Sequence, residues 1–296
     1  MSKNATEARL EAAIGLDMLD PTAALLMLAE GQQAAARAVT AAIPAIAAAA
    51  ERAAGALRHG GRLIYVGAGS SGLMAMADAL ELPGTYGIAR DRISVLMAGG
   101  IASLSDLAGG PEDDTALAEQ DAATITADDC VICVSASGST PYALAIAKIA
   151  KARGASVIGI ANNAAAPLFE FADVAVLLAT PPEVVAGSTR MGAGTAQKIA
   201  FNMLSTLTAI KLGHVHDGHM VDVRADNEKL RIRATRIVSE IAGIDMEAAG
   251  ERMRNADGSV KIAVLLAAGA KNTEAAQAAL ARSGQVLRQA LAEFER

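Results

Sequence analysis

Two serines and a glutamate in one short stretch have the types and spacing of a binding site for an anionic substrate. Ser70 and Ser71 lie in the glycine-serine segment Gly67–Gly72, between an apolar run and a helical pattern, and Glu81 follows near the end of that pattern. Where a strand leads through such a loop into a helix, free backbone N–H groups converge on an anion. The hydroxyls suit a phosphate, and we expect the carboxylate within reach of the ligand.

The same segment also reads G-x-G-x-x-G, which is the pattern of dinucleotide-binding loops. That interpretation requires an acidic residue at the end of the next strand, about 20 residues on, to bind the ribose. The next strand-like run, Arg92–Met97, is followed by Ala98, Gly99 and Gly100 instead. The missing acid disfavours a nicotinamide cofactor.

A second hydroxyl-rich segment follows another buried apolar run, Cys130–Val134. Its hydroxyl residues are Ser135, Ser137, Ser139 and Thr140. Such a segment can simply cap the next helix. Two segments of this kind after two strands of one sheet favour a ligand site at the carboxyl edge, because ligands of open α/β sheets bind there.

Two further clusters of polar residues have ordinary explanations. Glu112 lies in an acidic, turn-rich patch, which by itself is typical of a solvated helix start. His214, His216 and His219 resemble a metal-ligand cluster. They follow the end of a helical pattern, where histidine is favourable anyway, and no two of them are four residues apart. We therefore predict no metal site.

Composition narrows the class of protein. The chain has 296 residues, a net charge of −6, 2% aromatic residues and no tryptophan. These values argue against nucleic acid and anionic membranes as partners. We expect no membrane span and no signal peptide. Cys130 and Cys133 fall on opposite faces of one strand, so we expect them to be buried, unpaired thiols of a cytoplasmic protein.

Strand-like and helical runs alternate through the middle of the chain. The expected strands are Arg62–Val66, Ile93–Met97, Cys130–Val134, Ser156–Ile160 and Val174–Leu177. This alternation predicts an α/β fold with a parallel sheet covered by helices on both faces. We expect helices from Pro21 to Leu57 with a break at Pro44, a long helix from about Gly187 to Gly213, and another from Met220 to Ala242. The expected domains are an N-terminal helical segment (1–54), a central domain (55–242) and a small C-terminal helical subdomain (243–296).

These motifs together resemble the N-acetylmuramic acid 6-phosphate etherases, bacterial members of the sugar isomerase (SIS) domain family. GAGSSG with ADALELPGTYG resembles the first loop and a catalytic glutamate segment, and SASGSTPY resembles the second loop. The stretch from Glu183 to Thr206 and the later GHMVDVRADNEKL resemble the most specific signature of the family. TEAR near the N-terminus and AAGAKNTEAA near the C-terminus extend the resemblance over nearly the whole chain.

The resemblance implies a flavodoxin-like, three-layer SIS domain and a lyase. The expected reaction removes D-lactate from C3 of the open-chain sugar phosphate and adds water, giving N-acetylglucosamine 6-phosphate. It implies that Glu112 and Glu81 are catalytic; we assign Glu112 as the base and Glu81 as the acid. Ser70, Ser71, Ser135, Ser137, Ser139, Thr140, Arg190 and Lys198 are the expected substrate-binding residues. No metal or redox cofactor is required, and a homodimer with shared active sites is expected.

The chain departs from the family pattern at several positions. Leu73, Ser139 and Gly192 stand where the family usually has basic residues, and Ile101 stands where it usually has glutamate. Fewer cations weaken the binding of a substrate that carries a phosphate and a carboxylate. A sugar-phosphate sensor without catalysis and an aldose–ketose isomerase on the same fold are therefore the alternative functions.

Overall fold

A five-stranded parallel sheet forms the centre of the first of the two compact units of the chain. The computed structural model describes residues 5–100 and 109–294. The strands are β1 (Leu63–Gly67), β2 (Ile93–Met97), β3 (Cys130–Ser135), β4 (Ser156–Ala161) and β5 (Val174–Leu177). They pair in the order β2-β1-β3-β4-β5, and every pair is parallel. This is the flavodoxin-like, doubly wound order, so the predicted fold class is confirmed.

The strands form where the sequence predicts them because they are mainly apolar runs, which are buried in the interior of the sheet and partly buried at its edges. All residues of β1 and β3 are buried, as the strands of a covered parallel sheet must be. β1 and β3 are neighbours in register, with Val66 opposite Cys133, so both strands end at the same edge. Cys130 and Cys133 are buried free thiols, as expected.

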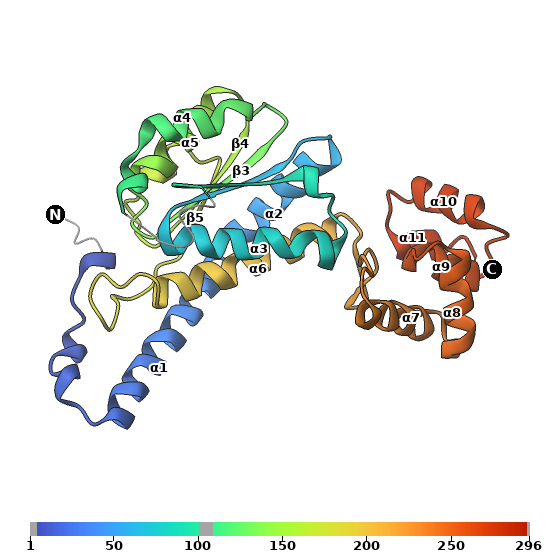
Figure 1. The fold of residues 1–296 in the computed structure, drawn as a ribbon, viewed down its shortest axis with the longest axis horizontal. Coiled ribbons are helices and arrows are strands. Elements are labelled where there is room, and N and C mark those ends of the chain that lie inside the picture. The colour runs from blue at the N-terminus through green and yellow to red at the C-terminus, as the bar shows by residue number, and fades with distance from the viewer. Residues whose placement is uncertain (1–4, 101–108, 295–296) are drawn as a thin grey trace. The chain divides into compact units, whose positions relative to one another are not determined.

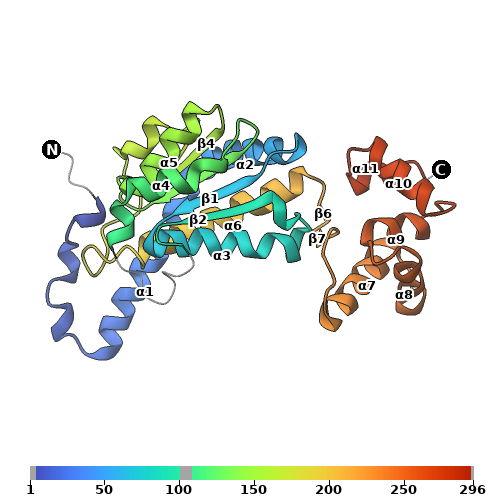
Figure 2. The same ribbon diagram turned by 45° about the horizontal axis from the view of Figure 1, so that its top comes forward.

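Helices cover both faces of the sheet, which gives three layers. α4 (Thr115–Asp121) and α5 (Pro141–Ala152) lie on one side, and α3 (Gly69–Tyr86) and α6 (Gly192–Lys211) lie on the other (Figures 1 and 2). Alternate strand residues point to each side. Val66 and Val131 pack in the core with Ile146 of α5, whereas the Tyr65 ring lies 5.8 Å from the Phe201 ring of α6.

Two helices precede the sheet. In α1 (Pro21–Ala38), the side chain of Asp20 accepts hydrogen bonds from two backbone N–H groups of the first turn, and α2 (Ile43–Arg58) packs against β5. A short 3₁₀ turn separates the two helices, and Pro44 lies in the first turn of α2, where a proline is tolerated. By length and composition the stretch 21–58 could span a membrane, since an 18-residue window within it has mean hydropathy 1.3, although no span was expected. Core helices of soluble proteins pass the same test, so this is weak evidence.

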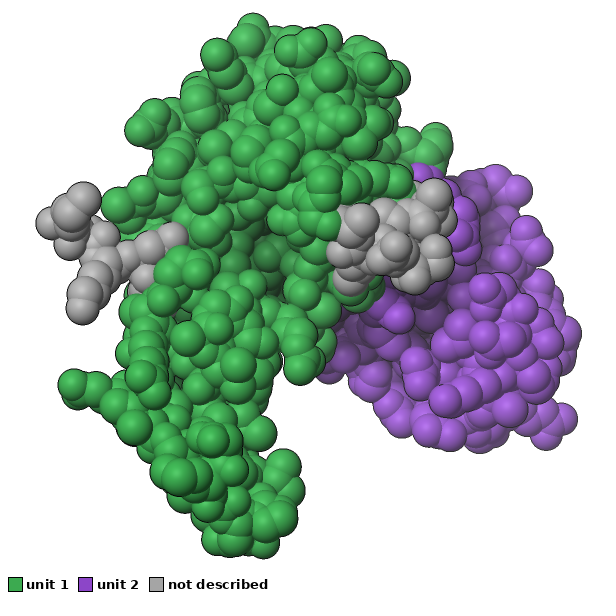
Figure 3. Space-filling model, turned by 60° about the vertical axis from the view of Figure 1, so that its left-hand side comes forward, with its two compact units in different colours: residues 1–80, 91–205 green, residues 81–90, 206–296 purple. Residues whose placement is uncertain are grey.

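The second compact unit comprises residues 81–90 and 206–296 (purple in Figure 3) and is mainly helical. Its helices are α7 (Glu228–Ala242), α8 (Met246–Asn255), α9 (Val260–Ala267), α10 (Thr273–Arg282) and α11 (Leu287–Leu291). Val238, Val264 and Leu287 belong to its core. The helix expected from Met220 begins only at Glu228, because Asn227 caps it through the N–H of Leu230 at 3.0 Å. The predicted domain boundaries at 54/55 and 242/243 stay a prediction.

Candidate functional site

Both hydroxyl-rich loops lie at the point where the strand order of the sheet reverses. One loop follows β1 and the other follows β3, and these two strands are neighbours whose connections run to opposite sides. In the flavodoxin-like order the ligand binds at this β1/β3 switch point, beyond the carboxyl ends of the strands. The fold therefore brings the two predicted loops to one edge, as the sequence predicted.

The first loop is shorter than expected, because α3 begins directly after β1. Gly69 is already the first helical residue, and Ser70 and Ser71 lie half-buried in the first turn. A side chain on Gly67 would meet the backbone of Gly72 at 2.8 Å, so the end of the strand and the helix touch. The hydroxyls thus lie among the N–H groups that no intrahelical carbonyl can pair.

Glu112 lies against this helix N-terminus. Its Oε1 atom is 2.6 Å from the position that a β-carbon on Gly69 would take. Glu112 belongs to a 3₁₀ turn, Gly110–Asp113, and is half-buried. Burial, and then the nearby Asp113 carboxylate, raise the pKa of Glu112 above its ordinary value. A carboxylate in this setting is a stronger base than one in water.

The second loop is a network of hydroxyl groups. Ser135 Oγ is 2.8 Å from Thr140 Oγ1 and 3.3 Å from Ser137 Oγ, and Ser139 Oγ donates to Ser137 Oγ at 2.9 Å. Thr140 precedes α5 but its side chain makes no capping hydrogen bond. The capping alternative therefore does not explain Thr140, and its hydroxyl faces the loop instead.

Neighbouring segments hold the second loop in shape. Gly138 has φ +71° and a side chain there would meet Ala166 Cβ at 2.2 Å, so only glycine fits. Asn163 donates from Nδ2 to the carbonyl of Ser137 at 3.1 Å. The same amide lies 3.3 Å from the hydroxyl of Thr6, which is buried. The TEAR segment of the chain thus lies beside its own second loop.

Glu183 is a buried acid that the sequence analysis did not single out. Its two carboxylate oxygens accept hydrogen bonds from the N–H groups of Gly192 and Ala193, each at 2.8 Å. Both N–H groups lie at the start of α6, which begins at Gly192 and not near Gly187. An internal carboxylate therefore occupies this helix N-terminus. Its position nine residues upstream of the helix is the signal that could have suggested it.

The remaining predicted binding residues lie on or next to α6. Arg190 is exposed in the turn before the helix, and Lys198 is exposed on it, where its Nζ donates to Asn202 Oδ1. Among the departures from the family pattern, Leu73 is half-buried on α3 and Gly192 is buried. Ile101 lies outside the described residues.

Glu81 is exposed on α3, twelve residues after Gly69. Glu81 falls in the second compact unit, whereas Gly69 and Glu112 fall in the first. The expectation that Glu81 lies within reach of the loop stays a prediction.

The three histidines face separate acids. The Nε2–carboxylate distances are 3.8 Å from His214 to Asp222, 3.6 Å from His216 to Asp217 and 3.6 Å from His219 to Glu240. Burial lowers the pKa of His214 and of His216. Among residues 5–100 and 109–294, no group of three or more potential ligands could hold a metal ion.

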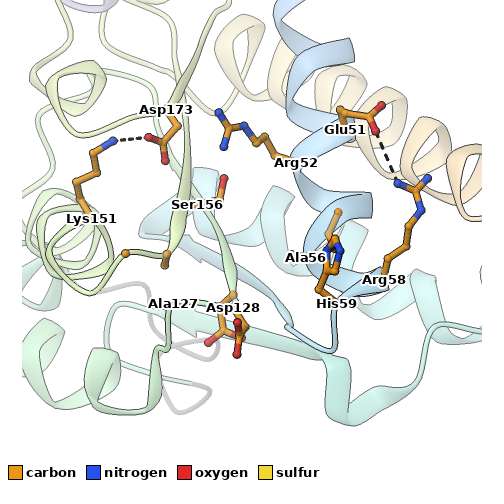
Figure 4. A pocket seen from close by; sticks show the side chains of 14 residues that line it. Glu51, Arg52, Ala56, Arg58, His59, Ala127, Asp128, Lys151, Ser156 and Asp173 are labelled. Atoms are coloured by element: carbon orange, nitrogen blue, oxygen red, sulfur yellow. Dashed lines mark hydrogen bonds and ion pairs between the residues drawn. The ribbon is translucent and has the colours of Figure 1, made fainter.

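A cavity of about 760 Å³ opens in the first unit where β3, β4 and β5 begin (Figure 4). Its charged lining is largely paired: Lys151 bonds Asp173, and Arg58 lies 3.7 Å from Glu51. No predicted site residue lines it. Since ligands of parallel sheets bind beyond the carboxyl ends of strands, this cavity is not the candidate active site.

The fold and the two loops define a SIS-type domain. Residues 93–207 match the family model of the SIS domain. A Bacteroides fragilis structure described as a phosphosugar isomerase of capsule formation has a similar fold, with TM-score 0.50 and 22% identity; the match covers 66% of this chain and 94% of that one.

Whole-chain comparison is more specific. N-acetylmuramic acid 6-phosphate etherase of Deinococcus radiodurans is 46% identical over 95% of this chain and 92% of its own length. The etherase of Halalkalibacterium halodurans is 38% identical over 99% of each chain. The etherase of Geobacillus thermodenitrificans is 42% identical over 88% of this chain and 90% of its own. The chain belongs to the N-acetylmuramic acid 6-phosphate etherase family.

Proposed function

We propose that this protein is a carbon–oxygen lyase that cleaves the D-lactyl ether of N-acetylmuramic acid 6-phosphate. The products are N-acetylglucosamine 6-phosphate and D-lactate. The observation that carries the proposal is the Glu112 carboxylate, held against the N-terminus of α3 beside the hydroxyls of the first loop. Membership of the etherase family supplies the substrate class.

The two loops bind the 6-phosphate in this proposal. Ser70 and Ser71 offer hydroxyls within the first turn of α3, and Ser135, Ser137 and Thr140 offer a second set after β3. Unpaired N–H groups and the positive end of the helix dipole favour a phosphate. Ser139, Arg190 and Lys198 are exposed and complete the set of proposed contacts.

The reaction begins with removal of the C2 proton, which the C1 aldehyde of the open-chain sugar acidifies. Glu112 takes this proton, and its raised pKa suits that role, because a base works best with a pKa near the operating pH. The C3–oxygen bond then breaks, its electron pair stays on the lactyl oxygen, and Glu81 protonates that oxygen. Water adds at C3 and a proton returns to C2, so one water is consumed.

The acid and the base must act on adjacent carbons, so their carboxylates must lie around the same sugar. Glu112 belongs to the first compact unit and Glu81 to the second. In this proposal the protein is a homodimer in which Glu81 of one copy works with Glu112 of the other.

Exposed apolar side chains support the homodimer. Met18 is 82% exposed, Leu25 65% and Leu26 60%, and all three lie at or near the start of α1, which extends away from the sheet (Figure 1). On α3, Leu80 is 66% exposed beside Glu81. Clusters of exposed apolar residues mark protein interfaces. The free, buried thiols suit a reducing compartment, and we place the reaction in the cytoplasm.

The deciding experiment is a D-lactate assay with the purified protein and N-acetylmuramic acid 6-phosphate. The etherase releases D-lactate and N-acetylglucosamine 6-phosphate together. A sensor, which the absence of basic residues at Leu73, Ser139 and Gly192 favours, binds the sugar phosphate without turnover. An isomerase changes the sugar and leaves the ether intact. Binding without lactate release would overturn the proposed function.

A further inference from the structure

A buried aspartate that the proposed mechanism does not use joins three elements of the first unit. Asp78 lies on α3 and is 5% exposed. Its Oδ2 accepts from the Tyr65 hydroxyl of β1 at 3.0 Å, and its Oδ1 accepts from Asn202 Nδ2 and Ser205 Oγ of α6, each at 2.9 Å. Three donors on one carboxylate satisfy most of its hydrogen-bonding capacity.

The Asp78 carboxylate determines how the Asn202 amide is oriented. A carboxylate only accepts hydrogen bonds, so it selects the NH₂ side of the amide. The carbonyl oxygen of Asn202 then faces the other way, where it accepts from Lys198 Nζ. The reverse orientation would place two oxygens against each other and remove the acceptor from Lys198.

Lys198 is exposed, and its charge acts on the Asp78 carboxylate without forming a close ion pair with it. Within the part of the chain that the structure describes, no carboxylate lies within ion-pair distance of its Nζ. A neutral amide thus holds the ammonium group without neutralising it. Lysine has a long flexible stem and a compact charge, so a fixed hydrogen bond determines where that charge lies.

We infer that Asp78 is a positioning residue: through the Asn202 amide it fixes the Lys198 ammonium for an anionic group of the substrate. The inference rests on the proposed function, in which Lys198 contacts the sugar phosphate. Burial raises the pKa of Asp78, and the donors from Asn202, Ser205 and Tyr65 oppose that rise. The three donors thus favour the ionised form that orients the amide.

The test is a double-mutant cycle with Asp78→Asn and Lys198→Met. Kinetics with N-acetylmuramic acid 6-phosphate and calorimetric binding of N-acetylglucosamine 6-phosphate are both measured. We expect each single variant to raise KM and the Kd of the product about tenfold, the effect of one lost charged contact. Neither variant should lower kcat by more than about twofold. The double variant should be no worse than Lys198→Met alone, because non-additivity marks residues that act together.

Two further variants separate positioning from simple stabilisation. Asn202→Leu removes the amide that joins Asp78 to Lys198 while leaving Asp78 in place, and we expect it to raise KM and Kd as Asp78→Asn does. It replaces Asp78→Asn in the test if that variant does not fold. Ser205→Ala removes a donor to the same oxygen without touching the contact to Lys198, and we expect an unchanged KM. If the double variant raised KM and Kd by the product of the effects of Asp78→Asn and Lys198→Met, the inference would be overturned. If the protein releases no D-lactate, the proposed function is wrong. The Kd values for N-acetylglucosamine 6-phosphate then test the coupling between Asp78 and Lys198 on their own.

Discussion

The Oε1 atom of Glu112 lies 2.6 Å from the position of a β-carbon on Gly69, although the two residues are 43 positions apart in the chain. Gly69 is the first residue of α3 and has φ +50°. Glycine is therefore required twice at this position, for its backbone conformation and for the space that the carboxylate occupies. This arrangement places the proposed base at the loop that we propose binds the phosphate.

Replacing Gly69 by alanine should lower the rate of D-lactate release much more than it lowers the stability of the fold. The positive φ costs about 1–2 kcal/mol for a residue with a β-carbon. The new methyl group also displaces the Glu112 carboxylate, so we expect D-lactate release to fall by about 10² or more. Urea denaturation and the lactate assay measure the two effects.

Gly243→Ala is the matched control for Gly69→Ala. Gly243 has φ +66° and no atom within 4 Å of the added carbon, so it suffers the same strain without a collision. We expect a similar loss of stability and a normal rate. An equally low rate in both variants would show that backbone strain, not displacement of Glu112, explains the defect.

The acidic limb of the pH profile should belong to Glu112. A base must be ionised, so a raised pKa makes activity fall at a higher pH than an ordinary glutamate would. Asp113→Asn removes the like charge that helps to raise this pKa, and the limb in kcat/KM should move to lower pH. Asp114→Asn is the control, since Asp114 caps α4 through the N–H of Leu117. A shift to higher pH in Asp113→Asn would contradict the assignment.

Thr140→Val should weaken substrate binding with little effect on stability. The Thr140 hydroxyl contacts Ser135 and makes no capping bond to α5, so its loss should cost less than the roughly 1 kcal/mol of a true N-cap. We expect KM to rise several-fold. Asp245→Ala, which removes a genuine cap of α8 bonded at 2.8 Å, should destabilise the protein while leaving KM unchanged. An unaltered KM in Thr140→Val would remove that hydroxyl from the phosphate site.

The sequence predicted the sheet well because its strands are short, mainly apolar runs bounded by turn residues. All five strands agree with the prediction to within one residue at each end. The location of the two loops was predictable because each follows a strand, and the carboxyl ends of parallel strands meet at one edge of the sheet. The contact of Glu112 with Gly69 was not, because it depends on how a distant 3₁₀ turn folds back onto α3.

The histidine segment carries a sequence signal for a β-hairpin. Asp217 and Gly218 both have positive φ, +46° and +81°, and they join β6 (Val215–His216) to β7 (His219–Met220). Asp-Gly between two short strands is a strong indication of a hairpin with a type I′ turn.

Isotope exchange should separate the roles of the two glutamates. If Glu112 removes the C2 proton and Glu81 protonates the leaving oxygen, Glu81→Gln should still wash deuterium from C2 while releasing almost no lactate. Glu112→Gln should lose both activities. Each loss should be on the order of 10² to 10⁴ in rate. Exchange that survives only in Glu112→Gln would reverse the two roles.

Mixing the two inactive variants should restore activity if each site takes Glu81 and Glu112 from different copies. A dimer of one Glu81→Gln chain and one Glu112→Gln chain then contains one complete site and one doubly defective site. At equal amounts, half of the dimers are mixed, so we expect about a quarter of the wild-type rate per chain. Differently tagged chains and native mass spectrometry verify that the subunits exchange.

The reciprocal mixture provides the control for this experiment. Wild-type chains are paired with chains that carry both substitutions. If the sites are shared, every site of the mixed dimer lacks one glutamate and the mixed dimer is inactive. If each chain holds a complete site, the wild-type half remains active, and the first mixture gains nothing. The exposed apolar side chains of Leu25, Leu26 and Leu80 are the reason to expect a dimer, and the two mixtures decide whether its sites are shared.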